Sequence, residues 1–156
     1  MSALKTEAEV LRRCLDLGVV ERRDVIAWAD ARIAQDDAPD VSITDVALAV
    51  GRSAADLAGL LRNVPGTPDR AAYLRGIFAR MRILLADNPT ALRLVAHALY
   101  LMVLDGECPS AEAEGAMYSF DDAVELARSG TFGDLTKIQT EVLSFLGDLS
   151  TDVVPG

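Results

Sequence analysis

The segment Thr90–Leu104, TALRLVAHALYLMVL, is the most uniformly apolar stretch of this 156-residue chain. After Thr90, only Arg93 and His97 interrupt it, and because residues four apart are neighbours on a helix, these two share one stripe. Such uniformity is typical of a helix that is covered by protein on most of its sides. A membrane span would need about 20 apolar residues. We therefore expect a central helix over 90–104 with other helices packed around it.

The residues around this segment favour a helix with defined ends. Asn88 can cap it, and Pro89 suits the first helical position, where its missing N–H costs nothing. Gly106 follows it, and glycine is the usual residue of a left-handed helix end. Elsewhere, helical periodicity and capping motifs that begin at Thr6, Ser42 and Ser53 predict further helices. We expect them at about 6–17, 21–35, 43–50, 54–63, 69–86, 111–129 and 133–147, followed by a loose tail over 153–156.

The composition agrees with helices rather than sheets. Hydrophobic residues make up 51% of the chain, but aromatic residues only 5%, so the core must consist of aliphatic side chains and alanine. The turn at 64–68, with two prolines and a glycine, is the best candidate for a domain boundary. Each side of it looks too small for a core of its own. The sequence therefore predicts one all-α domain, 1–156, built as a bundle of seven or eight helices around 90–104.

The charge of the chain is concentrated in its last third. The net charge is −9, and residues 1–104 contain equal numbers of acidic and basic side chains, so the whole excess lies in 105–156. Phosphate attraction needs a basic footprint, which argues against nucleic-acid binding. The charged N-terminus lacks the apolar region of a signal peptide, so we expect a cytoplasmic protein with no membrane contact.

Few residues offer catalytic or metal chemistry. His97 is the only histidine, and in an apolar helix we expect it to be a core residue with a structural role. Cys14 and Cys108 stand alone, without the spacing of a zinc site or a disulfide framework. We predict no enzyme, no metal and no cofactor. Trp28, the only tryptophan, has two readings: a core anchor with its N–H bonded, or an exposed anchor for a partner.

Three carboxylates around Pro39 look at first like a calcium loop. An EF-hand counted from Asp36 would need glycine at its sixth position and glutamate at its twelfth, but Val41 and Ala47 stand there. A solvated acidic turn explains the segment better than a cation site does.

Two segments carry a family resemblance. Cys14–Asp40, CLDLGVVERRDVIAWADARIAQDDAPD, resembles the opening of small acidic helical bacterial immunity proteins of polymorphic or contact-dependent toxin systems. Ser119–Leu146, SFDDAVELARSGTFGDLTKIQTEVLSFL, has a similar look, and together the two cover rather more than a third of the chain. The resemblance implies a protein that binds and neutralises a cognate toxin, often a basic nuclease. It transfers no specific binding residues.

An acidic surface could attract such a basic partner. If it does, we expect the contacts to come from carboxylates of the acidic third, with a second, weaker candidate in the acidic turn. An equally weighted alternative is that these charges only maintain solubility. Other functions that stay open are a helical adaptor that dimerises or docks on a larger assembly, and a hydrolase or lyase, which would need a deep pocket with His97 or with clustered carboxylates of perturbed pKa. The candidate partner-binding residues are Glu107, Glu112, Glu114, Asp121, Asp122, Glu125 and Asp134, then Asp36, Asp37 and Asp40.

Overall fold

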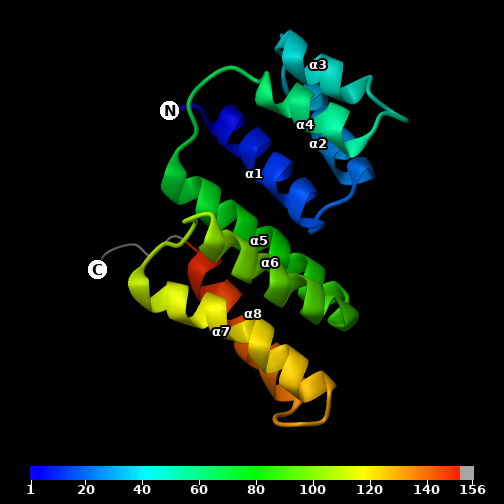
Figure 1. The fold of residues 1–156 in the computed structure, drawn as a ribbon. Coiled ribbons are helices and arrows are strands. Elements are labelled where there is room, and N and C mark those ends of the chain that lie inside the picture. Colours follow the sequence, from blue (N-terminus) through cyan, green and yellow to red (C-terminus); the bar gives the residue numbers. More distant parts are fainter. Residues whose placement is uncertain (152–156) are drawn as a thin grey trace. The chain divides into compact units, whose positions relative to one another are not determined.

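The computed structural model describes residues 1–151, so the predicted tail over 153–156 lies outside the described residues. Within them the chain forms eight α-helices, one short 3-10 helix and no strand (Figure 1). The predicted all-α class is confirmed, and each predicted helix exists with both ends within three residues of its expected bounds. The elements are α1 (Ala3–Leu17), α2 (Arg22–Gln35), α3 (Val41–Ala47), α4 (Ala54–Arg62), α5 (Arg70–Asp87), η1 (Pro89–Ala91), α6 (Leu92–Leu104), α7 (Ala111–Arg128) and α8 (Leu135–Ser150).

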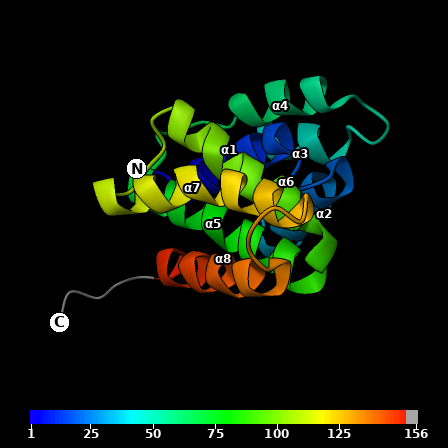
Figure 2. The same cartoon turned by 60° about the horizontal axis from the view of Figure 1, so that its bottom comes forward.

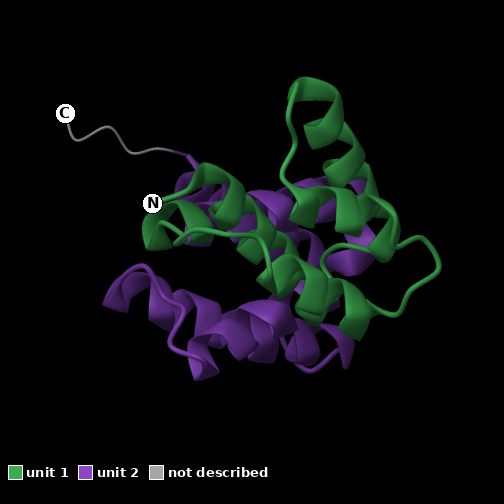
Figure 3. Cartoon of the chain, turned by 90° about the horizontal axis from the view of Figure 1, so that it is seen from above, with its two compact units in different colours: residues 1–73 green, residues 74–156 purple. Residues whose placement is uncertain are grey.

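The chain divides into two compact units, residues 1–73 and 74–156, here called unit 1 and unit 2 (Figure 3). The division falls in the first turn of α5, a few residues beyond the turn at 64–68 that marks the best boundary in the sequence. Unit 1 contains α1 to α4, and unit 2 contains most of α5 together with η1, α6, α7 and α8. That the chain is a single domain stays a prediction.

In unit 1, α1 packs against α4, and α2 packs against α3. The predicted start of α1 at Thr6 is wrong, because Ser2 is the capping residue and its side chain accepts a hydrogen bond from the Lys5 N–H at 3.2 Å. The Thr6 hydroxyl instead donates to the Ser2 carbonyl and accepts from the Asp69 N–H, which ties the end of the unit to its beginning. The cap of α3 is likewise Asp40 rather than Ser42. The Ser53 cap of α4 is as predicted.

Unit 2 is built on the apolar segment with which the sequence analysis began. Asn88 caps η1, with Pro89 in its first position, and Gly106 has a φ of 72° after the end of α6. One face of α6 is fully enclosed, with Leu99 and Met102 0% exposed. These end signals and this buried face were both expected.

Aromatic rings join three helices of unit 2. Phe145 of α8 makes edge contacts with Phe78 of α5, at 6.3 Å between centroids, and with Phe120 of α7, at 5.4 Å. Figure 2 shows α8 alongside α5 and α7. These contacts hold α7 in place, which matters because α7 carries half of the predicted carboxylates. None of the helices within residues 1–151 is long and apolar enough to cross a membrane.

Candidate functional site

Five of the ten predicted carboxylates lie on α7. The helix begins at Ser110, whose hydroxyl accepts a hydrogen bond from the Ala113 N–H at 3.1 Å. Glu112 and Glu114 occupy its first turn, where the helix dipole favours negative charge. From 105 to 127 the sequence contains no lysine or arginine, so nothing in this segment itself neutralises the carboxylates.

Two of these carboxylates contact side chains of α6. Glu125 pairs with Arg93 across the two helices at 3.0 Å and with Arg128 along α7 at 3.2 Å. Asp121 lies 3.5 Å from His97 Nδ1, a long contact by hydrogen-bond standards. Asp121 and Glu125 therefore face α6. Asp122, Glu112 and Glu114 form no ion pair in the described part of the chain and stay exposed.

His97 is not a core residue, contrary to the sequence-based prediction. Its side chain is 55% exposed, because Arg93, Leu94 and His97 occupy the face of α6 that is not enclosed. Two polar residues one turn apart in an otherwise apolar helix mark its solvent face, and that pattern was visible in the sequence. His97 lies beside Arg93, as expected.

A shallow groove of about 560 Å³ runs between α6 and α7 at this point, lined by polar side chains and Leu94. The Tyr100 ring stacks near His97, with centroids 6.0 Å apart, and contacts the Tyr118 ring at 5.5 Å. The side chains of the groove form two contacts between the helices, the Arg93–Glu125 ion pair and the His97–Asp121 contact. No serine or cysteine is among the described side chains that line the groove. The groove is lined by Thr90, Arg93, Leu94, His97, Asp121 and Glu125.

Two other predicted residues of the acidic third are already engaged. Glu107 is buried, so its carboxylate does not form part of an accessible acidic surface. Asp134 is the cap of α8, and its Oδ1 accepts a hydrogen bond from the Thr136 N–H at 2.9 Å. Both were selected from the sequence by charge alone, which does not distinguish a capping or buried carboxylate from a free one.

The second candidate, in the acidic turn, belongs to unit 1. Asp36 ends α2 and accepts from the Ala38 N–H, and Asp37 is exposed. Asp40 caps α3, and hydrogen bonds from the Ser42 hydroxyl, at 2.6 Å, and its N–H hold the pKa of Asp40 below its usual range. In the described part of the chain, no group of three or more His, Cys, Asp or Glu side chains could hold a metal ion. The turn is a pair of helix ends with solvated carboxylates.

Trp28 fits neither of its two readings fully. The residue is half-buried, and its indole N–H lies out of solvent without a hydrogen-bond partner in the described residues. The expected bond to this N–H is therefore wrong. Neither cysteine forms a disulfide bond; Cys14 is buried and Cys108 is half-buried.

Tyr118 is the functional candidate that sequence reasoning missed. It is 53% exposed and lies on α7 between Glu114 and Asp122, one helical turn from each. We call these three residues the α7 stripe. Spacing of four residues places them on one face, so the stripe was readable from the sequence.

No protein-family model, no curated protein and no solved structure matches this chain.

Proposed function

We propose that this protein is an immunity-type binding protein that neutralises a basic protein toxin through the outer face of α7. The observation that carries the proposal is the run from 105 to 127, which contains carboxylates but no lysine or arginine, and exposes Glu112, Glu114 and Asp122 on one helix. The resemblance of Ser119–Leu146 to immunity proteins covers the second half of the same helix. A toxin that acts on nucleic acid needs a basic surface, which such a helix attracts.

The α7 stripe has the composition of a protein-binding surface rather than of a merely solvated helix. Binding energy at interfaces is concentrated in a few residues, among which tyrosine is enriched. Tyr118 is held by the Tyr100 ring, so its orientation is restricted before a partner binds. The flanking carboxylates would orient a basic partner and accelerate its association, since steering raises association rates by 10–1000-fold at low salt.

Charge reversal on the stripe tests the proposal. The variant Glu114→Lys with Asp122→Lys should be compared with a control, Asp30→Lys with Asp45→Lys, which changes the net charge equally but on unit 1. Both pairs are exposed. We prefer Asp122 to Asp121 because Asp121 contacts His97, and reversing it would also disturb α6.

The measurement begins with capture of a partner from the native host on the wild-type protein. Association with that partner, and inhibition of its toxic activity, are then measured over a salt series. The stripe variant should associate roughly tenfold or more slowly at low salt and show a flatter salt dependence. The control variant should match the wild type. Equal losses in both variants, or none, would assign these carboxylates to solubility.

One observation favours the alternative of an adaptor that docks on another protein. Unit 1 exposes the large apolar side chains of Val41, Leu48 and Val50. Exposed apolar side chains that cluster are typical of interaction sites. A captured partner that is acidic, and whose binding is insensitive to the stripe variant, would favour this function over toxin neutralisation.

A further inference from the structure

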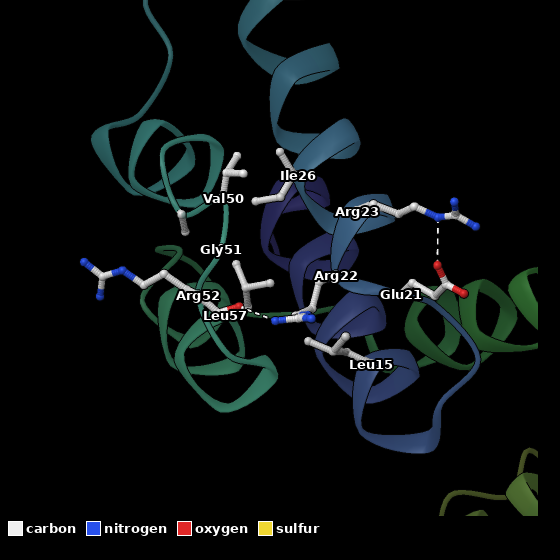
Figure 4. A pocket seen from close by; sticks show the side chains of 10 residues that line it. Leu15, Glu21, Arg22, Arg23, Ile26, Val50, Gly51, Arg52 and Leu57 are labelled. Carbon is white, nitrogen blue, oxygen red and sulfur yellow. Dashed lines mark hydrogen bonds and ion pairs between the residues drawn. The ribbon is translucent and has the colours of Figure 1, made fainter.

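A pocket of about 580 Å³ lies in unit 1, where the connection between α3 and α4 faces the first turn of α2 (Figure 4). Its walls are mainly apolar, and part of this apolar surface is open to solvent, since Val50 is 76% exposed and the nearby Leu48 77%. We call it the unit 1 pocket. The apolar lining consists of Leu15, Ile26, Ala49, Val50 and Leu57.

Arginines surround this apolar floor. Arg23 is paired with Glu21 at 2.7 Å, but Arg22 uses one N–H to bond the Arg52 carbonyl at 3.0 Å and has no carboxylate partner among the described residues. Arg52 likewise forms no ion pair within residues 1–151. The pocket is therefore a positively charged site on a chain whose net charge is −9.

The placement of these charges defines the shape of a suitable ligand. In Figure 4 the guanidinium groups of Arg52 and Arg23 extend to opposite sides of the pocket, and that of Arg22 lies between them, against the Arg52 carbonyl. The guanidinium groups of Arg22 and Arg52 are set apart in this view, so a ligand with two carboxylates suits them better than a ligand with one. A segment with an apolar side chain between two carboxylates is such a ligand.

The α7 stripe of this chain is such a segment. Glu114, Tyr118 and Asp122 stand on successive turns, about 6 Å apart along the helix axis, in the order acid, aromatic, acid. Neither of the two carboxylates is paired in the described part of the chain, and all three side chains are exposed. Docking of one helix face into an apolar groove is a common mode of protein recognition.

We propose that the unit 1 pocket of one copy binds the α7 stripe of a second copy. Tyr118 enters the apolar floor, and Glu114 and Asp122 pair with Arg22 and Arg52. The two surfaces differ, so the contact is head-to-tail, and a pair of copies keeps one free pocket and one free stripe for further copies. This contact covers the face proposed above for the toxin, so self-association and partner binding compete. The inference does not depend on the partner being a toxin.

The test measures mass against protein concentration by sedimentation velocity. The wild-type mass should rise above the 16.7 kDa of the monomer as concentration increases, and fall back at high salt. The variant Arg22→Glu with Arg52→Glu should lose at least about tenfold in self-affinity. A control with the same change in net charge, Arg62→Glu with Lys137→Glu, should associate like the wild type. Circular dichroism confirms that each variant is folded.

Charge exchange between two variants makes the test specific. The pocket variant and the stripe variant, Glu114→Lys with Asp122→Lys, should each be monomeric alone but associate when mixed, because every contact then joins opposite charges. Tyr118→Ala should weaken self-association, whereas Phe132→Ala, an exposed aromatic outside the stripe, should not. A wild type that stays monomeric at all concentrations, or a mixture that stays monomeric, overturns the proposal. Loss of toxin binding in the stripe variant alone, with the pocket variant still binding toxin, concerns only the proposed function.

Discussion

The two units use charged side chains in opposite ways. In unit 1, Lys5 and Glu9 form a 2.8 Å pair whose side chains are only 10% and 11% exposed, and Lys5 also donates to the Arg62 carbonyl at 2.7 Å. In unit 2, the pairs between α6 and α7 are on the surface, where the Arg93 side chain is 61% exposed. The first arrangement fastens α1 to the end of α4. The second leaves charges available to a partner.

The difference shows that burial, not the number of charges, decides which carboxylates are structural. A desolvated charge is costly unless it is paired and hydrogen-bonded, so removing one partner of a buried pair leaves the other uncompensated. An exposed pair is already solvated, and its loss typically costs about 0–1 kcal/mol. Residues of the first kind should affect stability strongly, and residues of the second kind only weakly.

The largest expected effect comes from neither kind of pair but from the apolar interior of unit 2. Leu99→Ala should reduce the free energy of unfolding by about 2–5 kcal/mol, because the side chain is fully buried and its removal leaves a cavity. Chemical denaturation measures this loss in the free energy of unfolding. The exposed Leu94→Ala, on the opposite face of α6, is the control and should cost much less. An unchanged midpoint for Leu99→Ala would show that α6 is not part of a packed core.

The second largest effect on stability is expected at the buried Lys5–Glu9 pair of unit 1. Lys5→Met keeps most of the aliphatic chain but removes the ammonium group, so the Arg62 carbonyl and one Glu9 oxygen lose a donor. We expect a loss of about 1–3 kcal/mol in the free energy of unfolding. The matched variant Arg93→Met, at the exposed pair with Glu125, should cost at most about 1 kcal/mol. Equal losses in the two variants would contradict the comparison between the units.

Much of the fold was readable from the sequence, because helices are specified locally. Periodicity, the Asn88-Pro89 start and the glycines after α1 and α6 located the helices within three residues. The cap of α1 was misplaced, because the Thr6 hydroxyl bonds Ser2 and Asp69, and the contact to Asp69 exists only in the folded chain.

The candidate site was predictable only in part, because contacts that exist only in the folded chain decide which carboxylates are accessible. Charge counting found the acidic α7, but it also selected Glu107, which is buried, and Asp134, which caps a helix. The unit 1 pocket has no sequence signature, since its lining comes from α1, α2, α4 and the connection between α3 and α4. Such a site depends on tertiary packing, which a pattern of residues along the chain does not encode directly.

A smaller effect is expected when the pH falls, and it should be traceable to the buried pair. Burial alone would raise the pKa of Glu9, but hydrogen bonds from Lys5 and Arg12 and their positive charges outweigh it, so the pKa lies below the ordinary 4.5. The stabilisation that the ionised Glu9 carboxylate provides is thus fully present above pH 4.5, and it is lost as the pH falls through the lowered pKa. Stability of the wild type and of Glu9→Gln, measured between neutral and acidic pH, should converge on acidification. Stability curves of the two proteins that stay parallel over the whole pH range would contradict this expectation.

The smallest expected effect is at His97, the residue that the sequence placed in the core. Since its side chain is 55% exposed and its contact with Asp121 is 3.5 Å long, His97→Asn should change the free energy of unfolding by only about 0.5 kcal/mol or less. A buried histidine would cost several times more, so this variant discriminates directly between the two placements. Binding of the partner should also stay largely intact, because in the described part of the chain His97 contacts Asp121 and Tyr100 and none of the three stripe residues. A turnover that disappears in His97→Asn at unchanged stability would instead identify an enzyme, and would move the function from the outer face of α7 to the groove between α6 and α7.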